Sequence, residues 1–299
     1  MDMHADQLNV SLTTVRALID EQFPEWRALK ITQVAAKGTV NAIFRIGAGL
    51  AARFALQRQD PAAAREGLRT EAAAARELLG RTRFRTPEPV AMGQPGHGYP
   101  LPWSVQTWLP GHVATGDGEP EAFAEDLAEF IHDVRSIPTG GRTFRGKGRG
   151  GDLRTHDAWL ETCFQHSENI LDVPRLRRMW TQMRELPRGS APDVMNHGDL
   201  IPANVLVSEG RLAGIIDVGG LGPADAALDL VSAWHLFEPG PRAALRRALK
   251  SDDLEWERGR AWAFHQAMGL VWYYAESNPP MSQLGRRTLA RIVTAGSEG

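Results

Sequence analysis

The sequence predicts an α+β protein whose first third forms a small antiparallel sheet and whose remainder is mostly helical. Short apolar runs, broken by turns rich in glycine and proline, occupy residues 29–109, which is the pattern of short strands. Apolar residues at helical spacing dominate residues 120–295. One hairpin, at residues 205–216, interrupts this helical part and has polar residues at both ends. We expect that hairpin to organise the functional site.

Composition limits the class of protein. The chain has 299 residues, enough for two domains or one large one, and 42% of them are hydrophobic, as in globular proteins. A formal net charge of −2 gives no long-range attraction to nucleic acid or to an anionic membrane, so we expect neither as a partner. The single cysteine, Cys163, cannot form an internal disulfide and fits a reducing compartment. The acidic start lacks the apolar core of a signal peptide, and residues 262–275 are too short an apolar segment to span a bilayer. We expect a cytoplasmic protein.

The first third supplies the sheet. We expect a helix over residues 11–26, strands over 29–35, 40–46 and 50–56, a helix over 60–80, and strands over 90–92 and 103–109. Asp60-Pro61 starts the second helix, because a capping aspartate followed by proline is typical of a helix N-terminus.

Two charged residues of this part are candidates for an ion pair. Arg53 lies in the middle of a strand, and Glu71 lies at the edge of the apolar stripe of the second helix. Burying a lone carboxylate costs roughly several kcal/mol, so Glu71 needs a cationic partner. Arg53 is the candidate; the alternative is that the two are unrelated surface charges.

The second part supplies the helices and the hairpin. We expect helices over residues 120–137, 155–170, 173–186, 228–237, 242–250, 252–274 and 282–295, with Asn278-Pro279-Pro280 ending the long one. The glycine-rich, basic segment Gly140–Gly151 follows a helix and lacks the strand–loop–helix context of a phosphate loop, so we interpret it as a connector. Apolar runs at 205–207 and 212–216 flank a four-residue turn.

Three oxygen-bearing side chains surround the hairpin. A hairpin brings its ends together, so we expect Asn204 and Asp217 to be neighbours, and Asp199 to arch over the same place. Carboxylate and amide oxygens suit a hard divalent cation and a reacting hydroxyl group. The alternative is an ordinary hairpin with surface acids.

The spacing of these residues resembles a known family. His197-Gly198-Asp199, Asn204 five residues later, and Asp217-Val218-Gly219 resemble the catalytic and metal-binding loops of the protein-kinase fold, and most closely those of the aminoglycoside phosphotransferase family. Gly198 stands where protein kinases have arginine, and Val218 where they have phenylalanine. The missing arginine argues against a protein kinase switched by phosphorylation. Residues 225–230 resemble the family's segment after the metal-binding aspartate.

The resemblance implies a bilobal, protein-kinase-like fold. Residues 1–109 would form the N-terminal nucleotide-binding lobe, with a hinge at about 104–111, and residues 112–299 the helical lobe with the catalytic loops and acceptor site. Asp199 would be the catalytic base, Asn204 and Asp217 would hold Mg²⁺ on the phosphates of ATP or GTP, and His197 would support the loop. The expected nucleotide contacts are Arg53, Glu71, Lys37, Gly38, Thr39, Asn41, Gln106, Thr107, Trp108 and Leu109. The family carries lysine at the position of Arg53, and Lys37 is a second candidate for the phosphate cation.

The implied reaction is transfer of the terminal phosphate to a hydroxyl of a small molecule, an aminoglycoside or another antibiotic. Residues 1–109 carry 13 bases and 10 acids and the rest 21 and 26, so the second part suits a cationic acceptor. Candidate acceptor contacts are Asp225, Glu238, Glu276 and Tyr273, although Glu238 and Glu276 also suit a plain surface role and Asp225 suits a cap of the helix that follows. The alternatives are a metabolic kinase for an amino alcohol or sugar, a macrolide phosphotransferase, and a nucleotide-binding module without transfer activity. Monomer and dimer both remain open.

Overall fold

A computed structural model describes residues 8–34, 41–146 and 148–295. The chain divides into two compact units. The first consists of residues 1–79, 85–110 and 217–219, and the second of residues 80–84, 111–216 and 220–299. Each unit is described below by itself.

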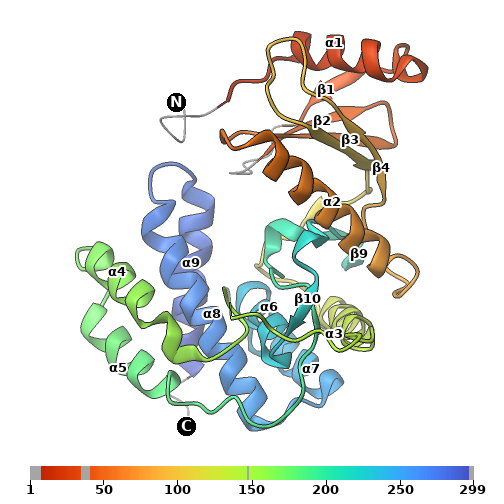
Figure 1. The fold of residues 1–299 in the computed structure, drawn as a ribbon. Coiled ribbons are helices and arrows are strands. Elements are labelled where there is room, and N and C mark those ends of the chain that lie inside the picture. Colours follow the sequence, from red (N-terminus) through yellow and green to blue (C-terminus); the bar gives the residue numbers. More distant parts are fainter. Residues whose placement is uncertain (1–7, 35–40, 147, 296–299) are drawn as a thin grey trace. The chain divides into compact units, whose positions relative to one another are not determined.

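The first unit is built on a five-stranded antiparallel sheet with strand order β1-β2-β3-β5-β4. The strands are β1 Ile31–Gln33, β2 Asn41–Ile46, β3 Leu50–Ala55, β4 Pro89–Gly93 and β5 Trp103–Thr107. Helix α1, Leu12–Gln22, contacts β1 and is followed by the 3₁₀ turn Pro24–Trp26, while helix α2, Pro61–Leu78, packs on β4 and β5 (Figure 1). Elements therefore appear close to the places that the sequence predicts, with ends shifted by a few residues.

Local chemistry explains where these helices begin. Ser11 Oγ accepts the backbone N–H of Thr14 and caps α1, and Asp60 caps α2, with proline at the first helical position. Aromatic packing fills the core of the unit: the ring of Phe54 stacks on Trp103 at 4.7 Å. Gly93 lies under the same indole, where an added Cβ would be 2.0 Å from Trp103 Cε2, so this strand position accepts only glycine.

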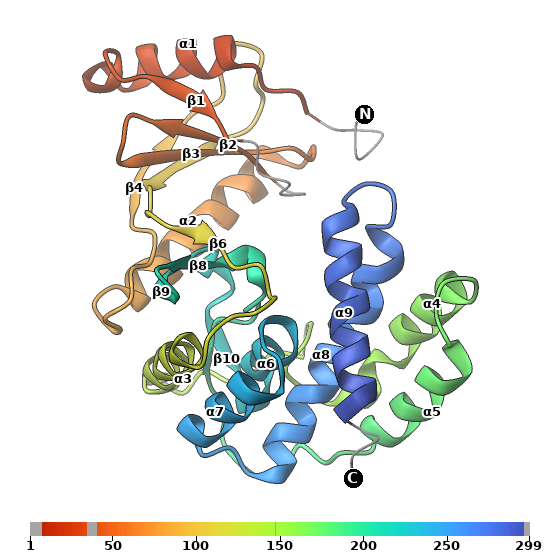
Figure 2. The ribbon, with the colours of Figure 1, turned by 180° about the vertical axis from the view of Figure 1, so that it is seen from behind.

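The second unit is mostly helical. Its helices are α3 Glu121–Arg135, α4 Asp157–Ser167, α5 Val173–Met183, α6 Val231–Leu236, α7 Pro239–Leu249, α8 Asp253–Tyr273 and α9 Pro279–Ala295. Helix α8 is the central element, because it packs against α9, α4, α5 and α6, and α3 pairs with α7 (Figure 2). Short 3₁₀ turns cover Leu153–His156, Pro202–Asn204, Val218–Gly220 and Ala226–Leu230.

The predicted hairpin is present in this unit. Strands β8 Val205–Ser208 and β9 Arg211–Ile215 pair in antiparallel fashion, and β6 His112–Val113 adds to β8. Both residues at the tip have positive φ, 51° at Glu209 and 70° at Gly210, which matches the right-handed twist of the two strands. A second pair joins β7 Val194–Asn196 to β10 Gly222–Ala224. Strands β6, β7 and β10 are two or three residues long, too short to give a periodic signal.

Two predicted helix boundaries are wrong. The helix expected over 228–237 begins as the 3₁₀ turn Ala226–Leu230, and only Val231–Leu236 is α-helical. Asn278-Pro279-Pro280 was expected only to end the long helix, yet Pro279 and Pro280 begin α9. Proline is favourable there because the first turn of a helix has no intrahelical acceptor for its N–H groups.

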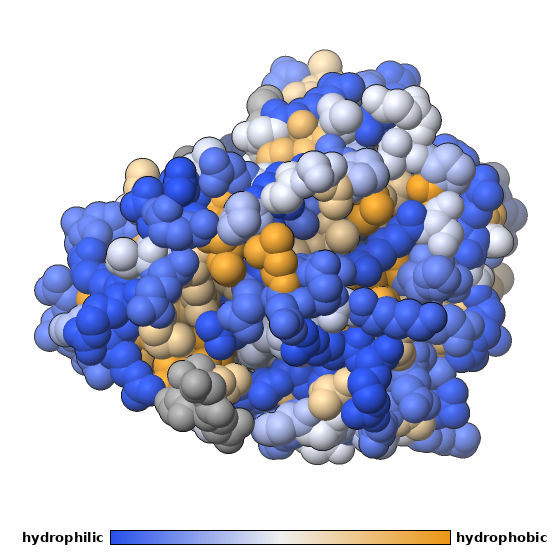
Figure 3. Space-filling model, turned by 90° about the horizontal axis from the view of Figure 1, so that it is seen from below, coloured by the Kyte–Doolittle hydropathy of each residue, from blue (hydrophilic) through white to orange (hydrophobic). Residues whose placement is uncertain are grey.

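The surface drawn in Figure 3 is mainly hydrophilic, with hydrophobic residues in separate patches. Within the described ranges, no helix combines the length and the apolar character needed to cross a membrane.

Candidate active site

Asp229 braces the loop that carries the candidate base. This carboxylate is fully buried; its Oδ2 accepts the backbone N–H of His197 at 2.7 Å and its Oδ1 accepts that of Gly198 at 2.8 Å. Burial raises the pKa of the Asp229 carboxyl above its ordinary value. Gly198 has φ +86°, where any side chain would be strained, which gives a physical reason for glycine at this position. The brace fixes the backbone immediately before Asp199.

His197 fixes the same loop to the end of the hairpin. Its buried ring donates from Nε2 to the carbonyl of Ile216 at 3.1 Å and accepts the backbone N–H of Asp199 at Nδ1, 3.3 Å away. With these partners, Nε2 carries the proton and Nδ1 is the acceptor. Asp229 and His197 together hold the Asp199 backbone from two sides.

The Asp199 carboxylate accepts three hydrogen bonds. Arg149 Nη2 and Gln266 Nε2 donate to Oδ1 at 2.9 and 2.7 Å, and Asn204 Nδ2 donates to Oδ2 at 3.1 Å. An ionised carboxylate has about four acceptor positions, so one remains, on Oδ2. The side chain is 40% exposed, which leaves that position accessible.

Asn204 lies beside Asp199, as the sequence predicts. It is buried, and its Nδ2 also donates to the backbone carbonyl of Asp199 at 2.9 Å, while its own carbonyl accepts the N–H of Ile216. Its Oδ1 receives no hydrogen bond from any residue that the structure describes. The amide oxygen is therefore left for an external ligand.

Behind these donors lie further residues that support Asp199 and that the sequence analysis did not single out. Gln266 Oε1 accepts from Arg149 Nη1 at 2.6 Å and from His235 Nε2 at 3.2 Å. His235 Nδ1 then accepts the hydroxyl of Thr288 at 2.8 Å. Burial lowers the pKa of His235 to about 4, so the ring is neutral near pH 7. A continuous chain of hydrogen bonds thus runs from Asp199 to helix α9.

In the first unit, Arg53 joins two acids. Its Nη1 lies 2.9 Å from Glu71 Oε2, and its Nη2 lies 3.3 Å from Asp217 Oδ1. Asp217 is 53% exposed and has φ +61°, an uncommon conformation for a residue with a side chain and one that recurs at functional sites. Gly219 follows closely: a Cβ there would lie 2.7 Å from Glu71 Cγ. The structure thus brings Arg53, Glu71 and Asp217 together.

Asn204 and Asp217 each carry an oxygen donor of the kind that Mg²⁺ accepts. The ion favours oxygen ligands and is usually held by one or two carboxylates, with phosphate and water completing the shell. Asn204 has a free amide oxygen, and Asp217 has an exposed carboxylate. Within the described ranges, no group of three or more His, Cys, Asp or Glu side chains is placed to hold a metal ion.

The other residues predicted to contact the nucleotide lie in β2, at the end of β5 and in the segment after it, or outside the described residues. Lys37, Gly38 and Thr39 lie outside the described residues. Asn41 begins β2 opposite Ala55, and Gln106 and Thr107 end β5. The backbone N–H of Trp108 donates to the carbonyl of Gly49, and Arg45 Cζ lies 4.9 Å from the centroid of the Trp108 ring. Leu109 is half-buried.

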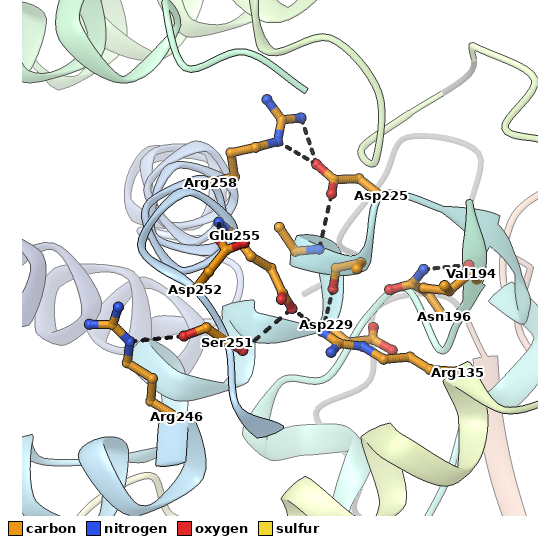
Figure 4. A network of polar contacts seen from close by, with 12 residues as sticks. Arg135, Val194, Asn196, Asp225, Asp229, Arg246, Ser251, Asp252, Glu255 and Arg258 are labelled. Atoms are coloured by element: carbon orange, nitrogen blue, oxygen red, sulfur yellow. Dashed lines mark hydrogen bonds and ion pairs between the residues drawn. The ribbon is translucent and has the colours of Figure 1, made fainter. Parts of the chain in front are cut away.

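Of the candidate acceptor contacts, Asp225 is engaged elsewhere. It is buried, accepts from Arg258 Nε at 2.6 Å and caps the 3₁₀ turn at Ala227 (Figure 4). The same network holds Arg135, whose guanidinium donates to Glu255 and to the carbonyl of Ala226 (Figure 4). This arrangement favours a structural role for Asp225 over contact with a substrate.

Glu238, Glu276 and Tyr273 are the remaining candidates. Glu238 accepts from Arg291 Nε at 2.9 Å, and Glu276 is exposed. Tyr273 is 47% exposed and lines a pocket of about 440 Å³ in the second unit. Arg149 and Gln266, the two partners of Asp199 Oδ1, line the same pocket.

Known structures share this fold. A variant of aminoglycoside 2'-phosphotransferase-IIIa in complex with GDP aligns with a TM-score of 0.73 at 18% identity, covering 97% of this chain and 99% of the other. The macrolide 2'-phosphotransferase of Brachybacterium faecium aligns with a TM-score of 0.61 at 15% identity, covering 91% and 97%. The fold is that of the kinase-like small-molecule phosphotransferases, as the sequence predicted.

Sequence similarity defines the family. The profile of the phosphotransferase enzyme family matches residues 31–262, and the chain belongs to this family. The aminoglycoside 3'-phosphotransferase of Streptomyces fradiae is 32% identical over 170 residues, 48% of this chain and 60% of the relative. One from Escherichia coli is 29% identical over 143 residues, 44% and 52%. The matches thus span about half the length of these relatives. The predicted resemblance to the aminoglycoside phosphotransferases is confirmed.

Proposed function

We propose that this protein transfers the terminal phosphate of ATP or GTP to a hydroxyl group of a small molecule, an aminoglycoside or another antibiotic. The observation that carries the proposal is the hydrogen bonding of Asp199. Three donors fix its carboxylate and leave one acceptor position on Oδ2. That position suits the O–H of an acceptor alcohol, which it would align with the terminal phosphorus.

Proton transfer from the alcohol would end on Asp199 Oδ2. Asn204 Nδ2 donates to the same oxygen and holds its direction. The Asp229 and His197 contacts keep the loop from moving as the alcohol approaches. Because phosphoryl transfer passes through a loose transition state, positioning contributes more than base strength.

A nucleotide would supply the phosphate. We assign the phosphate cation to Arg53, held by Glu71, and the metal ligands to Asn204 and Asp217. A bound Mg²⁺ would neutralise charge on the phosphates during transfer. The complexes of related phosphotransferases with GDP and with ADP support a nucleotide as co-substrate.

The test is acceptor-dependent release of ADP or GDP across a panel of aminoglycosides, macrolides, sugars and amino alcohols. We expect Asp199→Asn to lower kcat by about 10²–10⁴-fold with nucleotide binding retained. Asp133→Asn on α3 is the matched control and should keep the wild-type rate. Tight nucleotide binding without release of product in the presence of any acceptor would identify a binding module instead. A wild-type rate for Asp199→Asn would refute the assignment of the base.

A further inference from the structure

A pocket of the second unit opens beside Asp199. Six side chains that line it are used below, those of Arg149, His156, Trp159, His265, Gln266 and Tyr273, and Gly269 lies in the same wall. Both Arg149 and Gln266 also donate to Asp199 Oδ1, so a molecule in the pocket lies next to the carboxylate. Gln266 and Tyr273 lie beyond residue 262, where the match to the family profile ends.

The charge of the pocket is unfavourable for a polycation. Among its described lining residues there is no aspartate or glutamate, and the one permanently charged side chain is the cation Arg149. Burial lowers the pKa of both His265 and His156, so the two imidazoles are neutral near pH 7. A ligand with several ammonium groups would find no carboxylate among the described residues of this wall, and the Asp199 carboxylate beside it already pairs with Arg149.

The pocket instead offers apolar surface and neutral hydrogen-bonding groups. Trp159 and Tyr273 are 39% and 47% exposed, unusual for large aromatic side chains, which are normally covered. His265 is only 8% exposed, and neither ring nitrogen has a hydrogen-bond partner in the part of the chain that the structure describes. A buried polar group without a partner is costly, and a ligand hydroxyl would satisfy it.

We infer that this pocket binds the phosphate acceptor, and that the acceptor carries at most one positive charge, a broad apolar face and hydroxyl groups. The inference rests on the proposed function and narrows its substrate class away from polycationic aminoglycosides. The apolar face would lie on Trp159 and Tyr273, and hydroxyls would reach His265 and Asp199. A macrolide is the commercially accessible probe of this chemistry, and kanamycin is the polycationic counterpart.

Gly269 provides a steric test within the pocket wall. It lies in α8, and an added Cβ would be 3.0 Å from Trp159 Cζ2, so in Gly269→Ala the indole, which lines the pocket, must shift by a few tenths of an ångström. Alanine is the better helix former, and the variant should therefore fold. Gly67→Ala on α2 is the matched control, because no atom lies within 4 Å of the new methyl group there.

The experiment measures both acceptor binding and turnover with the full chain. Tryptophan fluorescence should report macrolide binding, and both Gly269→Ala and Tyr273→Ala should raise the macrolide KM and Kd by about tenfold, with kcat retained. Gly67→Ala should change neither constant. Macrolide-dependent release of ADP, with none for kanamycin, would support the inference.

Two results distinguish failure of this inference from failure of the proposed phosphotransfer. Kanamycin turnover with a KM that rises in Glu276→Gln and stays unchanged in Gly269→Ala would overturn the inference and leave phosphotransfer intact. Macrolide binding that depends on Gly269 and Tyr273, without acceptor-dependent release of ADP, would support the ligand class and overturn phosphotransfer. Failure of the macrolide to bind the wild-type protein would overturn the inference directly.

Discussion

Gln266 donates a hydrogen bond of 2.7 Å to Asp199 Oδ1 from a position 67 residues further along the chain. Its amide oxygen accepts from both Arg149 and His235, so the orientation of the amide is fixed. One neutral side chain thus connects the proposed base to the interior of the helical unit. The predictions below test this connection and the other supports of the site.

Replacing Gln266 by leucine should weaken the hydrogen bonding that positions the Asp199 carboxylate. The change removes one donor to Oδ1 and leaves His235 Nε2–H without its acceptor. We expect kcat to fall about tenfold, and the free energy of unfolding to fall by about 1–3 kcal/mol. Steady-state kinetics and urea unfolding measure the two effects. Gln165→Leu, at an exposed position of α4, is the control, and equal behaviour of the two variants would contradict the prediction.

His235 should make the protein less stable in acid. The pKa of His235 is about 4 in the folded chain, against an ordinary value of 6.5. As the pH falls from 6.5 to about 4, the unfolded chain takes up a proton here while the folded chain does not, so the free energy of unfolding falls. The full effect is about 3 kcal/mol. Urea unfolding at several pH values, for wild type and His235→Asn, measures it: the wild type should lose more stability over this range, and parallel curves would show that His235 is not responsible.

Asp229→Asn should weaken the loop that carries Asp199. The amide keeps one acceptor oxygen and presents an NH₂ group to a backbone N–H that the carboxylate now binds. We expect the free energy of unfolding to fall by about 2 kcal/mol, with a lower kcat. Asp172→Asn is the control, because this exposed residue caps α5 and asparagine caps helices equally well. A stable, fully active Asp229→Asn protein would refute the bracing role.

Two substitutions of Asp217 separate the effect of its charge from the effect of its backbone conformation. Asparagine tolerates its φ of +61°, so Asp217→Asn should keep the stability and lose Mg²⁺-dependent nucleotide binding. Asp217→Ala should lose the same binding and also about 1 kcal/mol of stability, because alanine is strained in this conformation. Calorimetric titration of nucleotide with and without Mg²⁺, together with thermal unfolding, compares the two. Unchanged Mg²⁺-dependent binding in Asp217→Asn would exclude it as a ligand.

The sequence predicted the features that depend on residues close together in the chain. Alternating apolar runs located the sheet and the hairpin, and the spacing of Asp199 and Asn204 placed two side chains that the structure finds in contact. The predicted partnership of Arg53 with Glu71 is also present as a contact of 2.9 Å. The pairing could be predicted because Glu71 lies at the edge of an apolar helix stripe, where a carboxylate is favoured by a nearby cation; the Glu71 side chain is 41% exposed.

The residues that the sequence did not single out are those whose role arises from distant parts of the chain. Arg149 lies in a glycine-rich segment without a periodic pattern, and Gln266 and His235 lie inside helices, where one polar residue gives no directional signal. The 3₁₀ turn before α6 was missed for a related reason. Asp229 turns inward there to bind the loop, and this tertiary contact replaces regular helix geometry.

The chain of contacts that ends at Thr288 connects helix α9 to Asp199, the proposed base. Removing the last helix would strip His235 of its hydroxyl partner, and the disturbance would pass through one amide to the proposed base. Shortened versions of this protein should therefore be judged by turnover as well as by solubility. Substitutions after residue 262, where the match to the family profile ends, could therefore change the proposed reaction while the loop that carries Asp199 keeps its sequence.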